Sequence, residues 1–210
     1  MAYPAEMDND ITIVIDRLKN SEKYISLFEN AFDDEITGEH FLKAFSQFLL
    51  ILVSANSKYD QVMRKEEGVE FSQQELSGYE VFKNNCSSCH QEPLFTNNEF
   101  VNNGIGIDTT LNDFGRMTIT QNASDSLKFR VPTLRNIEFS YPYMHDGRFR
   151  KLQEVIKHYT HGIEDSSTLA QELKQKIELS HKEQIDLVAF LLTLTDKEFL
   201  FNPKYSFPRN

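Results

Sequence analysis

Apolar residues in the first quarter of the chain recur at intervals of three and four positions. Because side chains with this spacing share one face of an α-helix, each stretch of the pattern predicts an amphipathic helix. We expect each apolar face to lie in a hydrophobic core. The stretches are Ile11, Val14, Ile15 and Leu18; Ile25, Phe28 and Phe32; and Phe41, Phe45, Phe48, Leu49 and Leu52.

Two later helices carry their own start signals. Ser72 is followed three residues on by Glu75, and Ser180 by Glu183, which is the spacing of a helix-capping box. Apolar residues then continue at helical spacing after each signal. The positions that share a face are Leu76, Tyr79, Phe82 and Cys86 in the first helix, and Ile185, Val188, Leu191 and Leu192 in the second. The chain therefore predicts an all-α fold.

Composition and charge exclude several classes of protein. With 210 residues, of which 40% are hydrophobic, the chain can bury a sizeable core. Its net charge of −10 argues against nucleic acid as a partner, because no basic stripe is present to pair with phosphates. The most apolar run, Phe48 to Val53, is far shorter than the roughly 20 residues of a membrane span, so we expect no transmembrane segment.

The strongest chemical signal is the segment Cys86-Ser87-Ser88-Cys89-His90, which contains the only two cysteines of the chain. Two thiols at this spacing can add to the two vinyl groups of one haem, while the adjacent histidine reaches the iron. We therefore expect a covalent haem c held by Cys86 and Cys89, with His90 as an iron ligand.

A structural zinc site and a redox-active dithiol are the two other interpretations of the cysteine pair. A structural zinc site needs a second pair of ligands, and the histidines form no pair of suitable spacing near the cysteines. A redox-active dithiol is typical of a strand-helix unit, whereas the sequence upstream of Cys86 has helical periodicity.

The periodicity is lost between Phe95 and Arg130, where Asn, Gly, Thr and Asp dominate. An irregular connection of this length is usually functional or disordered. Because it directly follows the cysteine motif, we expect it to wrap over the haem edge. A mobile surface loop is the alternative.

Several further motifs resemble the bacterial di-haem cytochrome c peroxidases, a family that includes the enzyme that matures methylamine dehydrogenase. Residues 129–136 read FRVPTLRN and residues 141–149 read YPYMHDGRF, followed by Leu152, Val155 and Tyr159. Upstream, residues 56–60 read NSKYD. The resemblance implies a cytochrome c-like haem domain at residues 66–210, preceded by a helical segment, residues 1–65, that continues from a first haem domain.

The resemblance also implies a function. In the family the haem of this domain passes electrons, while hydrogen peroxide is reduced at a second haem. The single attachment motif and the absence of a leader after Met1 suggest a fragment of an exported, periplasmic protein. We expect hydrogen peroxide, a small donor such as a cytochrome c or a cupredoxin, and a second copy in a homodimer as partners. The alternatives are oxidation of a protein or organic substrate, and a mono-haem electron-transfer module.

The sixth iron ligand differs among members of this family, where either methionine or tyrosine occupies the position. The matching residue is Tyr159, which shares a helical face with Leu152, Val155 and Ile156 and so points inward. A buried tyrosine with an ordinary hydrogen-bond acceptor is the alternative. Met144 is the fallback ligand, and His158 and His161 are expected to be surface or hydrogen-bonding residues.

Three further site predictions follow from the resemblance. Glu6 matches a glutamate that acts as the acid-base group at the peroxide-reducing haem. Arg130 and Arg135 are expected to pair with haem propionates. The backbone carbonyls of Ser140 and Pro142 match positions that bind calcium.

Overall fold

The computed structural model describes residues 8–206 and divides the chain into two compact units, Met1–Val53 and Ser54–Asn210. The division falls before the predicted boundary at residues 65 and 66 because the segment after Ser54 belongs to the second unit. Tyr59 is only 3% exposed there. Its backbone N–H donates to the carbonyl of Thr193 at 3.0 Å.

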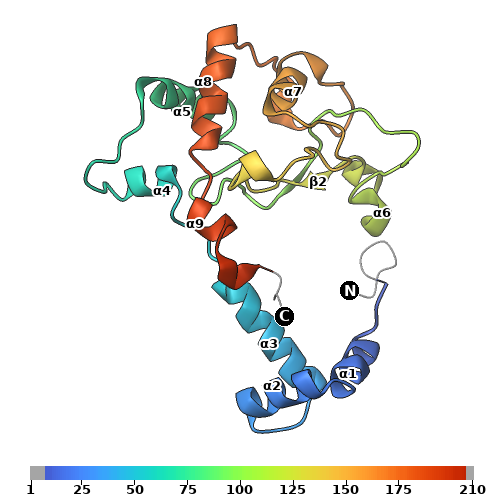
Figure 1. Ribbon diagram of the computed structural model, residues 1–210. Helices are drawn as coiled ribbons and strands as arrows, with labels where there is room; N and C mark the ends of the chain where they lie inside the picture. The colour runs from blue at the N-terminus through green and yellow to red at the C-terminus, as the bar shows by residue number, and fades with distance from the viewer. Residues whose placement is uncertain (1–7, 207–210) are drawn as a thin grey trace. The chain divides into compact units, whose positions relative to one another are not determined.

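The first unit consists of the three helices that the apolar pattern predicts (Figure 1). They are α1 (Ile11–Lys19), α2 (Glu22–Phe32) and α3 (Gly38–Ile51). The Asp10 side chain caps α1 by accepting from the N–H of Thr12, and Thr37 caps α3 by accepting from that of His40.

The prediction that all three apolar faces are core is wrong for α3, and α1 has no fully buried residue either. Phe28 of α2 and Ile36 are buried, but Phe45, Phe48 and Leu49 are 44%, 45% and 51% exposed. A unit of three short helices has little interior, so it cannot enclose every apolar position that its helices present.

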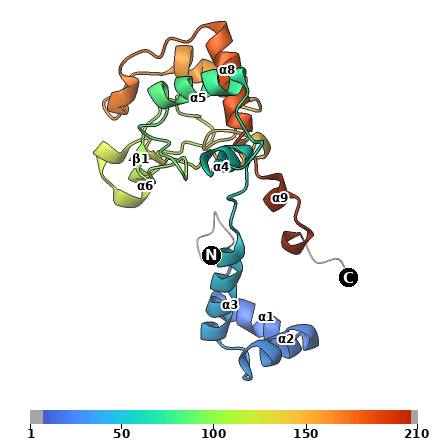
Figure 2. The same ribbon diagram turned by 90° about the vertical axis from the view of Figure 1, so that its left-hand side faces the viewer.

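The second unit is also mainly helical (Figure 2). Its α-helices are α4 (Lys58–Met63), α5 (Gln73–Asn85), α6 (Met117–Thr120), α7 (Leu152–Lys157), α8 (His181–Leu192) and α9 (Lys197–Leu200). A π-helical turn, η3 (His158–Gly162), continues α7. Short 3-10 turns lie at η1 (Ala123–Asp125), η2 (Ile137–Phe139), η4 (Gln171–Leu173) and η5 (Pro203–Tyr205). The strands β1 (Phe100–Val101) and β2 (Phe129–Arg130) pair antiparallel. The all-α fold class is confirmed.

The core of this unit forms where α5 packs against α8. Both helices begin with the predicted capping boxes, Ser72 with Glu75 and Ser180 with Glu183. The two backbones come close at Gly78, where a Cβ would lie 1.9 Å from the carbonyl oxygen of Asp186. Aromatic rings fill the space beyond this contact, and the Phe82 and Phe190 centroids are 5.2 Å apart.

The polar segment between Phe95 and Arg130 is irregular, as predicted, except for β1, α6, η1 and β2 at its end. It is packed rather than lying loosely on the surface, because Asn102 is 1% and Ile105 4% exposed. The Asn102 amide donates to Ser166 Oγ at 3.0 Å and to Thr168 Oγ1 at 2.9 Å. These bonds attach the segment to the chain that follows η3.

In the part of the chain that the structure describes, every helix is too short or too polar to span a bilayer.

Candidate haem site

The two cysteines and His90 lie at the C-terminal end of α5, as the sequence predicts. Cys86 is the residue that ends the helix, and its carbonyl accepts the backbone N–H of Cys89 at 3.3 Å and that of His90 at 2.9 Å. This tight turn brings both thiols and the imidazole together. Both cysteines are free thiols.

The environment of the two thiols disfavours thiolate chemistry. Burial and, to a smaller extent, the neighbouring Cys89 raise the pKa of Cys86 to about 12. Burial also raises the pKa of Cys89. A redox-active dithiol needs a lowered thiol pKa, so the surroundings of this pair argue against that interpretation. No cluster of three or more His, Cys, Asp or Glu suited to a metal ion occurs within residues 8–206, which argues against zinc.

The His90 ring is held in the form that binds iron. Its Nδ1 lies 3.1 Å from the carbonyl oxygen of Phe95, and since a carbonyl only accepts, Nδ1 carries the proton. In the neutral ring, Nε2 then keeps its lone pair for a metal. Burial lowers the pKa of His90 and so favours this neutral form. Phe95 is itself fixed, because its side chain is fully buried.

Tyr159 lies on the π-helical turn η3, a backbone irregularity that is frequent at functional sites. Burial raises the pKa of its hydroxyl, and both Cys86 and Cys89 are close enough to raise it further. Tyr159 therefore lies within electrostatic range of the cysteine pair.

Asn103, which no sequence motif indicated, joins the two candidate sixth ligands. Its Nδ2 lies 3.5 Å from the hydroxyl oxygen of Tyr159 and 3.5 Å from the sulfur of Met144. The available signal was the polar run Asn102-Asn103-Gly104 in the segment expected to cover the haem, although nothing in that run distinguishes Asn103.

The two histidines of η3, His158 and His161, both have hydrogen-bond partners. His158 is 5% exposed, and its Nε2 lies 3.0 Å from the carbonyl oxygen of Asn103. The Nδ1 of His161 lies 2.7 Å from Thr160 Oγ1. His158 is thus a buried link between η3 and the segment that carries Asn103.

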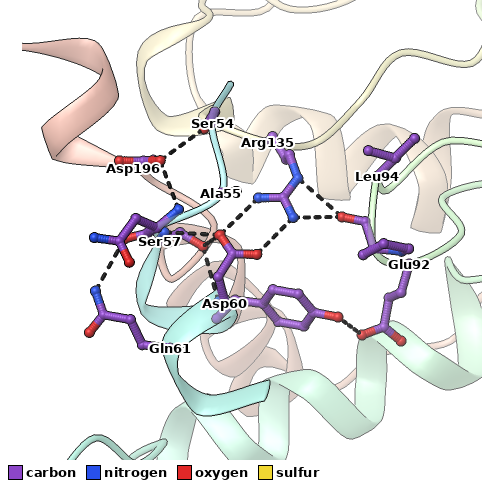
Figure 3. Close-up of polar contacts among 12 residues, drawn as sticks. Ser54, Ala55, Ser57, Asp60, Gln61, Glu92, Leu94, Arg135 and Asp196 are labelled. Atoms are coloured by element: carbon purple, nitrogen blue, oxygen red, sulfur yellow. Dashed lines mark hydrogen bonds and ion pairs between the residues drawn. The ribbon is translucent and has the colours of Figure 1, made fainter. Parts of the chain in front are cut away.

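The two arginines proposed for haem propionates already have protein partners. Arg130 donates to Asn98 Oδ1 at 2.9 Å. Arg135 forms a bidentate ion pair with Asp60, with distances of 2.9 and 2.8 Å, and also donates to the carbonyl of Pro93 (Figure 3). Burial opposes ionisation of Asp60, but hydrogen bonds from Arg135 and Ser57 outweigh it and lower its pKa. Arg135 therefore connects α4 to the turn after His90.

Glu92, also drawn in Figure 3, forms a second polar link that no sequence motif indicated. Its carboxylate accepts from the hydroxyl of Tyr59 and, at 2.9 Å, from that of Tyr79. Burial and the hydrogen bond to Glu92 together raise the pKa of Tyr79 to about 12. Two tyrosines of the core thus anchor the residues that follow His90.

The remaining predicted positions are the two proposed calcium ligands and the proposed acid-base glutamate. Ser140 and Pro142 are exposed. Glu6 lies outside the described residues.

The fold and the cysteine motif define a c-type haem protein, and comparison with known proteins agrees. Residues 76–195 match the cytochrome c family, and residues 1–68 match the family described as di-haem cytochrome c peroxidase. The chain therefore belongs to the cytochrome c proteins and, among them, to the di-haem cytochrome c peroxidase and MauG family. The cofactor of this family is a covalent haem c, and the two thiols and the neutral imidazole described above fit it.

Individual relatives support the same assignment. The chain is 35% identical to "Methylamine utilization protein MauG" of Methylophilus methylotrophus. The match spans 90% of this chain and 57% of that protein. The chain is 32% identical to "Cytochrome c551 peroxidase" of Nitrosomonas europaea, and this match spans 93% of this chain and 56% of that protein. The chain thus spans a little over half the length of these relatives.

A solved structure resembles the fold over nearly the whole chain. A MauG-like protein associated with microbial copper homeostasis superposes with a TM-score of 0.77 and 28% sequence identity. The match covers 94% of this chain and 65% of that one.

Proposed function

We propose that this chain supplies the electron-transfer haem of a peroxidase-like oxidoreductase that reduces hydrogen peroxide. Cys86 and Cys89 would hold the haem covalently, and His90 would bind its iron. The observation that carries the proposal is the neutral His90 ring, oriented by the Phe95 carbonyl beside two unpaired thiols. The relatives named as peroxidases support the reaction class.

A bound haem would supply one-electron chemistry, and the chain's own residues would set its conditions. The Phe95 carbonyl fixes the direction of the His90 ring. The buried aromatic rings behind it, Phe82, Phe95 and Phe190, exclude water from that side. Tyr159 offers an oxygen and Met144 a sulfur as the remaining protein ligand.

A second candidate function is oxidation of a protein or organic substrate, as the names of the MauG relatives suggest. The proximity of Tyr159 to the cysteines favours it. An anionic oxygen ligand stabilises ferric and higher oxidation states, whereas methionine raises the reduction potential. Ionising a free phenol at pH 7 costs roughly 4 kcal/mol, which coordination to ferric iron would offset.

The partners and the location belong to the same proposal. A net charge of −10 favours a basic donor protein, such as a cytochrome c or a cupredoxin. A periplasmic location fits covalent haem attachment. Calcium binding at Ser140 and Pro142, catalysis by Glu6 and a homodimer stay predictions.

The first test is to produce the chain with c-haem maturation machinery and to measure, after denaturation, whether haem remains attached. We expect covalent haem in the wild type, single attachment in Cys86→Ser and Cys89→Ser, and normal attachment in the control Ser87→Ala. Absence of covalent haem despite competent maturation would contradict the proposal. Electron transfer from a reduced donor cytochrome, followed in a stopped-flow spectrometer, then tests the role.

A further inference from the structure

We propose that Asn103 is a positioning residue that selects the sixth iron ligand, favouring the oxygen of Tyr159 over the sulfur of Met144. The inference rests on the proposed function, because it requires the covalent haem at Cys86 and Cys89. It assigns a role to a residue of the polar segment that neither the motifs nor the relatives' names identify.

The contacts of the Asn103 amide carry the argument. Its Nδ2 lies 3.5 Å from the Tyr159 hydroxyl oxygen and 3.5 Å from the Met144 sulfur. A side-chain amide has two N–H donors, so it can point one at each neighbour. An oxygen is a good acceptor and a thioether sulfur a weak one, so the amide stabilises Tyr159 at this place more than Met144.

Asn103 is held firmly enough to act in this way. Its Oδ1 accepts from the backbone N–H of Ile105 at 3.3 Å, which fixes which end of the amide points at the ligands. Its neighbour Asn102 is fully buried and bonded to Ser166 and Thr168. Because the side chain is already ordered, little conformational entropy is lost when it binds a ligand oxygen.

The same segment is coupled to the turn that carries Tyr159. His158, the residue before Tyr159, bonds through Nε2 to the Asn103 carbonyl at 3.0 Å. The Glu164 N–H donates to the Gly104 carbonyl at 2.8 Å. A displacement of Asn103 would therefore move the tyrosine-bearing turn as well, so the backbone and the amide act on the same ligand.

The competing ligand lies on a turn of its own. Met144 has φ of +70°, in the left-handed region that non-glycine residues rarely adopt. The turn is held by the Tyr143 N–H, which donates to the Phe149 carbonyl at 2.7 Å. Met144 is thus kept within reach of Asn103, and the two ligands are alternatives at one place.

The test uses the haem-loaded chain and two substitutions of Asn103. Asn103→Leu keeps the approximate size and removes both donors. Asn103→Asp keeps an acceptor for Ile105 and replaces the donating nitrogen by an oxygen, which repels the Tyr159 oxygen. For each we expect the ratio of oxygen-ligated to sulfur-ligated haem to fall roughly threefold to tenfold, the equivalent of one net hydrogen bond. The ferric absorption and electron paramagnetic resonance spectra measure this ratio.

The reduction potential gives an independent readout. Asn103→Leu should shift the midpoint potential upward, in the same direction as Tyr159→Phe, because sulfur ligation raises it. The negative charge added in Asn103→Asp stabilises the ferric state and opposes this shift, so that variant is judged from its spectra alone. Asn103→Leu added to Tyr159→Phe should change neither spectrum nor potential further, since Asn103 acts through the tyrosine. The control Asn122→Leu, at an exposed asparagine of the same polar segment, should match the wild type.

The outcomes separate this inference from the proposed function. Absent covalent haem in the wild type would reject the proposed function and the inference with it. Attached haem with wild-type spectra in Asn103→Asp would reject the inference alone. A further shift in the double variant would also reject it, because Asn103 would then act independently of Tyr159. If Asn103→Leu fails to fold, Asn103→Asp decides.

Discussion

The side of the site that carries His90 comes from one short stretch of chain, whereas the side that carries Tyr159 is assembled from distant segments. Cys86, Cys89, His90 and Phe95 lie within one helix end and the turn after it. Asn103, Met144 and Tyr159 come from a polar loop, a tight turn and a π-helical turn.

The two sides also differ in how tightly they are held. The His90 side rests on the fully buried rings of Phe82 and Phe95, and its hydrogen bond is 3.1 Å long. On the other side, the contacts of Asn103 with its two neighbours are both 3.5 Å. The residues proposed to attach the cofactor are therefore held by the core, while the proposed ligands Tyr159 and Met144 are linked by a few weaker contacts that sequence changes can adjust.

The largest expected effect tests the rigid side. Phe95→Ala removes a fully buried ring and should lower the free energy of unfolding by about 3–5 kcal/mol. Phe201→Ala removes a ring that is 64% exposed and serves as the control, with a loss well under that value. Urea denaturation measures both. Equal losses would show that the His90 side is no more firmly packed than the surface.

The second prediction concerns the ion pair behind the same turn. Arg135→Leu leaves Asp60 buried without its partner, so it should lower the free energy of unfolding by about 3 kcal/mol at neutral pH. The pKa of Asp60 is lower in the folded state than its unfolded value of 3.8. The ion pair therefore contributes its full stability above that unfolded pKa, and the contribution is lost as the pH falls toward the folded-state pKa. When the pH is lowered below the unfolded pKa of Asp60, the wild type should thus lose more stability than the variant. Parallel loss in both proteins would contradict this.

The difference between the two sides also explains what the sequence could predict. The helices, both capping boxes and the Cys86–His90 site follow from spacing along the chain, because their contacts are local. Asn103 and Glu92 could not be found this way, since each acts on residues that only the folded chain brings near. The same reasoning accounts for Arg135, a natural propionate partner by residue type whose guanidinium binds Asp60.

The third prediction tests the adjustable side through its backbone. Gly104 has φ of +72°, and a Cβ there would lie 2.5 Å from Ile163 Cγ2, whereas Gly68 has φ of +79° and open space around it. Both alanine substitutions carry a strain of about 1–2 kcal/mol, but only Gly104→Ala adds a steric clash. We expect Gly104→Ala to be the more destabilising and also to change the ferric haem spectrum. Equal effects at both glycines would show that the loop beside Tyr159 accommodates the added Cβ without a steric cost.

The smallest expected effect returns to the rigid side and concerns the tyrosines on Glu92. Glu92→Gln removes a charged acceptor from Tyr79, whose pKa is raised to about 12 by burial and by this hydrogen bond. The pKa should fall partway toward its usual value, because burial persists, and stability should drop by about 1 kcal/mol. Ultraviolet titration of the phenols measures the shift, with Tyr79→Phe identifying the signal. An unchanged titration would mean that Glu92 does not contribute to anchoring the turn after His90, leaving Arg135 and the Phe95 ring as its supports.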